Sequence, residues 1–172
     1  APIMFSHSSA RSVAKHVRNV PDTVLKRIKD NGGIVMVNFF SGFVDPEAAE
    51  IMSNMFDVSR ELRKKYEDDD QYNAAMTRWR VANPYPPGTI HDVVDHIDHL
   101  VRIAGINHVG IGSDYDGVSK LPMGLEDVST YPRITQLLLD RGYSRRDIDK
   151  IMSANMMRVI RQVERVSQSR NN

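Results

Sequence analysis

The sequence predicts an α/β fold in which three strands of a parallel sheet alternate with helices. Three short apolar runs are separated by segments whose apolar residues recur at helical spacing, which is the pattern of strand–helix–strand units. The runs are residues 3–5, 34–40 and 108–112. Polar residues stand in or directly after each run, namely Ser6, His7, Asn38, Ser113 and Asp114. Because catalytic groups of α/β barrels lie at the carboxyl ends of the strands, the pattern indicates three consecutive strands of a barrel.

The first strand is expected to be buried and already under way where the chain begins. Residues 1–7 contain no polar lead-in and no initiator methionine, so we expect the chain to begin inside a larger domain. After a polar loop, Asn19 is expected to cap a helix that has Pro21 in its first turn. Gly32 and Gly33 are expected to end that helix.

The second strand, residues 34–40, is a near-continuous apolar run, which is typical of a parallel strand covered on both faces. Asp45 is expected to start the next helix, and a shorter helix should contain Tyr72 and Trp79. We therefore treat residues 43–87 as an inserted helical and loop segment between the second and third strands. Its two aromatic residues are candidates for a lid or a dimer contact.

The remaining segments complete the pattern of a strand followed by helices. Thr89 and Asp92 resemble a capping box at the start of an amphipathic helix that ends at Gly105. The third strand follows, and then a loop and a helix. A second capping box at Ser144 and Asp147 precedes a long amphipathic helix, which we expect to run to about residue 166.

Length, charge and cysteine content exclude several classes of function. The 172 residues have a net charge of +1, so the chain carries no strong field to attract nucleic acid or an anionic membrane. There is no cysteine, which excludes disulfides and thiolate chemistry. No apolar run approaches the roughly 18 residues that span a bilayer. The apolar content of 41% and the charged content of 26% are those of an ordinary globular protein.

Three side chains at or near the predicted strand ends have alternatives that the residues alone leave open. His7 suits a metal through its neutral imidazole, or else it is a hydrogen-bonded histidine at a strand end. Asp114 suits a metal ligand, a general acid or base, or a group that caps a loop. Arg18 offers a planar fork that suits a carboxylate, or else it is a surface arginine.

A second group of ionisable residues crowds the helix between the second and third strands. It consists of His91, Asp95, His96, Asp98 and His99. His91, Asp95 and His99 are spaced to share one face, but a helix between two barrel strands packs outside the barrel. We therefore expect a polar helix face with one ion pair or hydrogen bond to a neighbouring strand. His16 and His108 are likewise expected to be structural.

A series of short motifs along the chain resembles the renal (membrane) dipeptidase family. They are Phe5-Ser6-His7-Ser8-Ser9-Ala10, Arg18-Asn19-Val20-Pro21-Asp22, Val37-Asn38-Phe39, Asp95-His96-Ile97-Asp98-His99, Gly112-Ser113-Asp114-Tyr115-Asp116-Gly117, Gly124-Leu125-Glu126-Asp127-Val128 and Asn155-Met156-Met157-Arg158-Val159. They cover nearly the whole chain, and their order makes the resemblance specific. The length of segment 43–87 is more similar to the bacterial branch of the family than to the animal enzymes.

The resemblance implies the C-terminal portion of a (β/α)8 TIM barrel of the metal-dependent hydrolase type, with this chain supplying the last three strands. It implies a zinc metallo-dipeptidase, in which a glutamate bridges two zinc ions. His7 resembles the last histidine ligand of that zinc pair. Arg18 resembles the arginine that binds the carboxylate of the dipeptide substrate, and Asp114 resembles the aspartate that donates or accepts a proton during cleavage.

The other zinc ligands of the family would lie upstream of Ala1, so we expect this chain alone to be inactive. We expect it to need the missing N-terminal half of the barrel or another copy, in a homodimer. A bacterial cytoplasm or periplasm is favoured over a membrane anchor. Two alternatives stay open: an amidohydrolase-type metal-dependent hydrolase that acts on a non-peptide substrate, and a non-catalytic half-barrel fragment.

Overall fold

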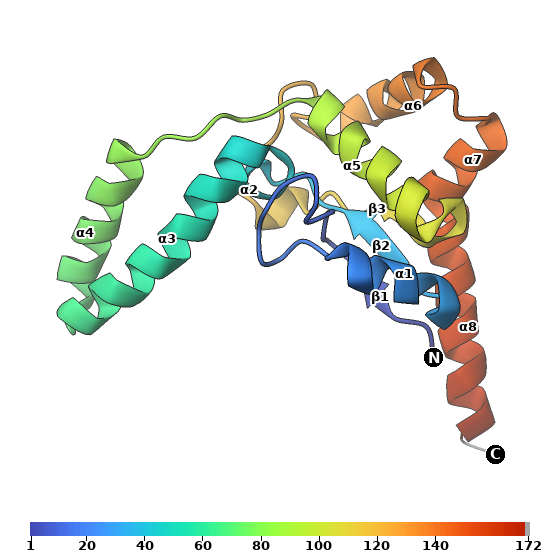
Figure 1. The fold of residues 1–172 in the computed structure, drawn as a ribbon, viewed down its shortest axis with the longest axis horizontal. Coiled ribbons are helices and arrows are strands. Elements are labelled where there is room, and N and C mark those ends of the chain that lie inside the picture. The colour runs from blue at the N-terminus through green and yellow to red at the C-terminus, as the bar shows by residue number, and fades with distance from the viewer. Residues whose placement is uncertain (171–172) are drawn as a thin grey trace.

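The computed structural model describes residues 1–170, which contain a three-stranded parallel sheet (Figure 1). Strands β1 (Met4–Phe5), β2 (Ile34–Val37) and β3 (Val109–Ile111) lie in the order β1-β2-β3. Met4 lies opposite Ile34 and Val35 opposite Val109, and both pairings are parallel. These pairings confirm the predicted α/β fold with parallel strands.

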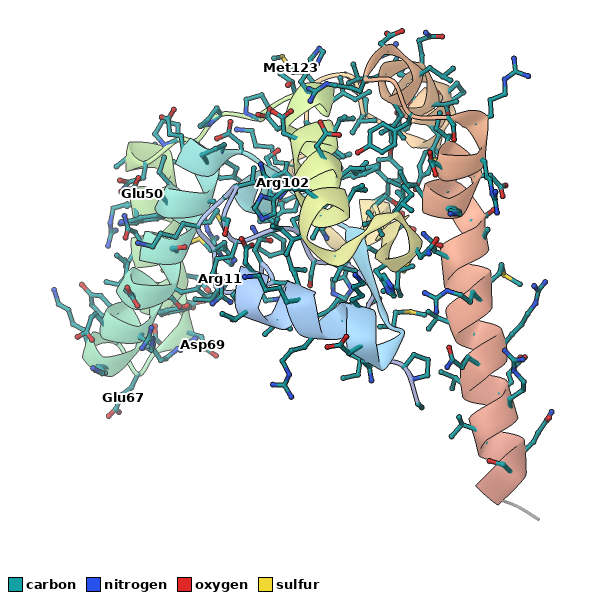
Figure 2. All side chains as sticks on the ribbon, turned by 45° about the vertical axis from the view of Figure 1, so that its right-hand side comes forward. Arg11, Glu50, Glu67, Asp69, Arg102 and Met123 are labelled. Carbon is teal, nitrogen blue, oxygen red and sulfur yellow. The ribbon has the colours of Figure 1, made fainter. Side chains whose placement is uncertain are left out.

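Helices fill the connections between the strands and follow the last strand. They are α1 (Asp22–Asn31), α2 (Ser41–Val44), α3 (Pro46–Lys65), α4 (Asp69–Ala82), α5 (Ile90–Ala104), α6 (Tyr131–Asp140), α7 (Arg145–Asp149) and α8 (Asn155–Arg170). Helices α3 and α4 form a hairpin that projects away from the sheet (Figure 1). Figure 2 shows Glu67 and Asp69 at the far end of this hairpin. None of the helices within residues 1–170 is both long and apolar enough to cross a membrane.

The two faces of β2 are buried against different helices. Val35 and Val37 belong to a large cluster that contains Leu25 of α1 and Leu100 of α5. Ile34 and Met36 form a smaller cluster with Val159 of α8. Successive side chains of a strand point to opposite faces, so the central strand must be apolar at every position. This arrangement explains why residues 34–37 lack a polar alternation.

Several helix ends follow the local signals in the sequence. The Asp45 side chain accepts a hydrogen bond from the Ala48 N–H at 2.7 Å and so caps α3. The Thr89 N–H donates to Asp92 Oδ2 at 2.6 Å, which completes the capping box of α5. Gly32 ends α1 with a φ of 74°, a left-handed conformation that favours glycine.

One expectation about the ends of the chain is wrong, and another is refined. Strand β1 is not buried, because Ile3 and Met4 are 53% and 36% exposed. Within residues 1–170, β1 pairs with β2 on one side, and its other edge is left uncovered. The predicted long last helix is present, but a π-helical turn at Lys150–Ala154 joins α7 to α8. Such a turn adds one residue to the repeat, which an average helical period does not reveal.

Candidate active site

The carboxyl ends of β1 and β3 meet at one open depression of about 380 Å³. His7 and Asp114 both line it, together with Ser6, Met36, Ile111, Gly112, Ser113, Tyr131 and Met156. Gly112 allows this convergence, because a Cβ atom at that position would lie 1.9 Å from the Ser6 carbonyl oxygen. The structure therefore brings two of the three expected site residues to one surface.

Arg18 reaches this surface by contacting His7. Its Nη2 atom lies 3.0 Å from His7 Nε2, and His7 Nδ1 lies 2.7 Å from the Ser6 hydroxyl. A guanidinium can only donate, so Nε2 is the acceptor and the imidazole proton resides on Nδ1. His7 is therefore neutral, with the Nε2 lone pair directed at a cation. Arg18 does not line the depression itself.

Asp114 adopts an unusual backbone conformation immediately after β3. Its φ of 61° and ψ of 35° are left-handed, and no other non-glycine residue between 1 and 170 has a positive φ. A left-handed conformation costs about 1 kcal/mol or more for a residue with a Cβ, and such strain often marks functional sites. A Cβ at Gly117 would lie 2.2 Å from Asp114 Oδ1, so the carboxylate packs where a side chain is missing.

Asn38 orients the Asp114 carboxylate. The Asn38 side chain is fully buried, and its amide nitrogen donates to Asp114 Oδ2 at 3.2 Å. Its amide oxygen accepts a hydrogen bond from the Phe40 N–H, which fixes the direction of the amide. The position of Asn38 on the second strand made it a polar candidate in the sequence, but its partner on the third strand was not predictable from spacing.

The loop between β1 and α1 is held by buried side chains rather than by a helix cap. Asn19 does not cap α1, whose N-cap position is Pro21 without a side-chain hydrogen bond. The Asn19 amide instead bonds to three main-chain groups, two in the loop and one at Phe43 of α2. His16 is also buried, and its Nδ1 accepts the Arg18 N–H at 3.1 Å. Burial and the nearby Arg18 and Arg11 charges lower the pKa of His16 to about 4.

Two histidines of α5 are structural, but they do not lie on an outward polar face. His96 is fully buried; its Nδ1 accepts the Ala10 N–H at 3.0 Å, and its Nε2 donates to the Val44 carbonyl at 3.1 Å. Burial lowers the pKa of His96 to about 4. His99 is 8% exposed and lies 2.7 Å from Asp22 Oδ1. These contacts link α5 to the loop that carries Arg18, and sequence periodicity missed them because the partners are distant along the chain.

The side chains at this depression can supply one metal ligand, but not a complete metal site. Among residues 1–170, no group of three or more His, Cys, Asp or Glu side chains lies close enough together to hold a metal ion. His7 has the neutral form of a ligating imidazole, with Nδ1 held by Ser6 and the Nε2 lone pair used by Arg18. A metal bound here would need further ligands.

Comparison with known families and sequences identifies relatives over the whole chain. A family model described as "Membrane dipeptidase (Peptidase family M19)" matches residues 1–172. Dipeptidase tcpJ of the fungus Claviceps purpurea is 38% identical over 171 residues, which is 98% of this chain and 31% of the relative. The chain thus spans about a third of the length of this curated relative.

Solved structures give the same result. The probable dipeptidase PvdM from Pseudomonas aeruginosa matches with a TM-score of 0.72 and 28% identity, over 92% of this chain and 44% of that protein. A metallopeptidase from Rhodobacter sphaeroides, solved with a phosphinate mimic of the dipeptide L-Ala-D-Ala, matches with a TM-score of 0.67 and 25% identity. That match covers 91% of this chain and 34% of the other. The relatives include a fungal protein as well as bacterial ones, so the bacterial branch stays a prediction.

Proposed function

Because this chain belongs to the membrane dipeptidase family, peptidase family M19, we propose that it supplies part of the active site of a zinc-dependent dipeptidase. One observation carries the proposal: His7, which contacts Arg18, lines the same depression as the strained Asp114. A metal ligand, a carboxylate-binding group and a proton carrier are the groups that hydrolysis of a dipeptide requires. The rest of the site would come from residues outside this chain.

In this proposal His7 is one of the zinc ligands. Its Nε2 atom carries the lone pair, and the Ser6 hydroxyl accepts the Nδ1 proton and orients the ring. The remaining ligands of two zinc ions, including a bridging glutamate, would lie in the part of the enzyme that this chain does not contain. When bound, zinc acts as a Lewis acid and lowers the pKa of a bound water to about 7.

Arg18 would bind the terminal carboxylate of the dipeptide. Its guanidinium is exposed, and the carbon at its centre lies 5.8 Å from the centre of the Phe43 ring. The aromatic ring supports a planar cation without using its hydrogen-bond donors, so these remain available for a carboxylate. Binding of zinc by His7 would release Arg18 from its present partner. A free carboxylate would then be the natural replacement.

Asp114 would move a proton between the attacking water and the leaving amine. Asn38 donates to one carboxylate oxygen, the other lies beside Gly117, and Asp114 itself lines the depression. A half-buried carboxylate with one fixed hydrogen bond can accept and return a proton without changing its position.

We further propose that the sheet is the last part of a barrel. Strands β1 and β3 each have an unpaired edge within residues 1–170, and Ile3 and Met4 are exposed beside one of them. Unpaired edges and apolar surface favour covering by further strands. The cover would be the remaining strands of the complete enzyme or a second copy, and the chain alone would not hydrolyse dipeptides.

The proposed function is tested with a dipeptide and its C-terminal amide as paired substrates of the complete enzyme. We expect the wild type to prefer the dipeptide by about 10-fold to 100-fold in kcat/KM, since a charge-assisted bond contributes about 1.5–3 kcal/mol. In Arg18→Gln this preference should vanish. Lys15→Gln, an exposed cation in the same loop, is the control and should keep it. Equal preference in the wild type and Arg18→Gln would refute the clamp, and activity only on non-peptide amides would refute the dipeptidase.

A further inference from the structure

Asn19 follows Arg18 directly, and its side chain is 1% exposed. The amide oxygen accepts the Ser9 N–H at 3.1 Å. The amide nitrogen donates to the Ala14 carbonyl at 2.8 Å and to the Phe43 carbonyl at 2.7 Å. The amide thus uses its oxygen and both of its N–H donors on main-chain groups. A buried amide with every donor used fixes the geometry of each segment that it contacts.

The first of these bonds closes the loop that separates His7 from Arg18. Ser9 lies two residues after His7, and Asn19 lies one residue after Arg18, so the Ser9–Asn19 bond ties the two ends together. The Val20 N–H also donates to the Ser9 carbonyl at 2.7 Å, and short-range main-chain bonds form turns inside the loop, such as the bond from the His16 N–H to the Ala14 carbonyl. The Asn19 bond to Ala14 adds a side-chain tie between the end of the loop and its interior.

The bond to Phe43 connects the loop to the start of segment 43–87. The guanidinium carbon of Arg18 lies over the Phe43 ring, 5.8 Å from its centre. The centre of the His16 ring lies 4.6 Å from the centre of the Phe43 ring. The main chain of Phe43 is held by Asn19, and its ring faces Arg18. Asn19 therefore holds the residue whose ring packs against the Arg18 guanidinium.

We propose that Asn19 is a positioning residue, which sets Arg18 relative to His7 and gives the start of segment 43–87 a part in substrate binding. The inference rests on the proposed role of Arg18 as the carboxylate clamp. Without the Asn19 amide, the Ser9 N–H and the Phe43 carbonyl would lose their partner, and the Ala14 carbonyl would keep only the His16 N–H, so the loop would adopt several conformations. Binding of the carboxylate would then carry an additional ordering cost.

The chain offers a matched control at the opposite end of the sheet. Asn155 is 3% exposed, and its amide donates to the Ile106 and Val109 carbonyls at 2.7 and 2.9 Å. It is as buried as Asn19 and also bonds to main-chain groups, but its hydrogen bonds reach neither Arg18 nor a residue that lines the depression, which it meets only through its chain neighbour Met156. Replacing either asparagine should destabilise the fold, whereas only Asn19 should affect substrate binding.

The test compares Asn19→Ala and Asn155→Ala in the complete enzyme, with Asn19→Ser as a milder variant if Asn19→Ala does not fold. For the Asn19 variants we expect KM for a dipeptide to rise about tenfold or more, with kcat changed less than about threefold. Zinc content should stay that of the wild type. Asn155→Ala should lower the melting temperature comparably and leave KM within about twofold. An unchanged KM in the Asn19 variants, or an equal rise in Asn155→Ala, overturns the proposal.

A second measurement does not depend on activity. Lys15 and Arg18 are exposed in the loop, so trypsin can cleave after either residue once the loop opens. We expect cleavage there to accelerate about tenfold in Asn19→Ala and to be unaffected in Asn155→Ala, as identified by mass spectrometry of the fragments. If the wild-type enzyme hydrolyses no dipeptide, the proposed function fails. The cleavage experiment still shows whether Asn19 anchors the loop. Unchanged cleavage overturns the anchoring role in either case.

Discussion

The two ends of the small sheet use polar side chains for opposite purposes. At the amino ends of the strands, Arg158 donates to the carbonyls of Gly32, Gly33 and Asn107. Its two terminal nitrogens thus hold separate stretches of main chain together. At the carboxyl ends, buried Asn38 holds the carboxylate of half-buried Asp114. The polar groups of one end thus maintain the fold, and those of the other end keep reactive groups in place at the surface.

The two ends of the sheet also differ in backbone strain. Gly32 and Gly105, near the amino ends, have φ values of 74° and 92° and carry no side chain to clash. Asp114, at the carboxyl end of β3, has a φ of 61° and keeps its side chain. Glycine avoids strain where the backbone merely turns, whereas Asp114 keeps its side chain in a strained conformation at the candidate site. In the proposed function, this conformation places the proton-carrying carboxylate at a cost in stability.

The largest expected effect is that of Asp114→Asn in the complete enzyme. An amide cannot carry the proton, so kcat should fall about 100-fold to 10,000-fold while zinc content is unchanged. Asparagine tolerates the left-handed conformation, so stability should hold. Asp116→Asn, an exposed neighbour, is the control and should retain activity. Loss of zinc together with activity would make Asp114 a metal ligand rather than a proton carrier.

Acid should destabilise the carboxyl end of the sheet through His16 and His96. Their folded-state pKa values of about 4 lie below the ordinary value of 6.5, so the unfolded chain binds more protons between these values. Stability should therefore fall as pH drops from 6.5 to 4, by about 2 kcal/mol for each histidine at pH 5. Unfolding in urea at pH 7.5 and pH 5 measures the loss.

Single substitutions test which histidines cause the loss of stability at low pH. His16 faces Arg18 and Arg11, and both charges oppose its protonation. His16→Phe should remove about half of the pH dependence whatever its effect on stability at pH 7.5. His91→Asn changes an exposed histidine and should leave the slope unaltered. A His16→Phe protein with the wild-type slope would mean that other groups cause the acid loss.

The sequence predicts that His7 and Asp114 lie at one edge of the sheet, and the reason is local. Each follows a strand, and strand ends on one edge of a parallel sheet converge whatever the details of packing. The role of Arg18 comes from the family resemblance, because its position in a long loop leaves a surface arginine open. Contacts between residues far apart in the sequence cannot be predicted in this way. His96 bonds to Ala10, 86 residues away, and an average helical period does not reveal such a partner.

Short polar residues show the same limit. Asn19 before a proline has the local chemistry of a helix cap, and that prediction is wrong because three distant or loop main-chain groups compete for its amide. Strand β1 is too short for the burial of its side chains to be predicted from the sequence. Met4 is apolar, yet it lies on an edge strand and is partly exposed. Elements are thus predictable from periodicity, whereas burial of single polar groups depends on tertiary neighbours.

The amino end of the sheet can be weakened without touching the site. Arg158→Ala removes the Arg158 donor from the Gly32 and Asn107 carbonyls and leaves the Gly33 carbonyl only its bond to His108, so unfolding free energy should fall by about 2 kcal/mol. Arg161→Ala removes an exposed arginine of the same helix and should change stability by less than about 0.5 kcal/mol. Neither variant should alter KM. A raised KM in Arg158→Ala would show that the two ends of the sheet are coupled.

The smallest effect is expected where a hydrogen bond of the site is open to water. Ser6→Ala removes the acceptor of the His7 Nδ1 proton, a kind of change that typically weakens metal binding about 10-fold to 100-fold. Ser6 is exposed, so a water molecule can take the place of the hydroxyl, and the loss should be about tenfold or less. Competition with a zinc chelator measures it in the complete enzyme. Ser12→Ala removes another exposed hydroxyl of the same loop, bonded to Asp22, and should not change zinc affinity. Equal zinc affinity in wild type and Ser6→Ala would mean that water fully replaces the hydroxyl, whereas a loss beyond 100-fold would mean that Ser6 holds the ring alone.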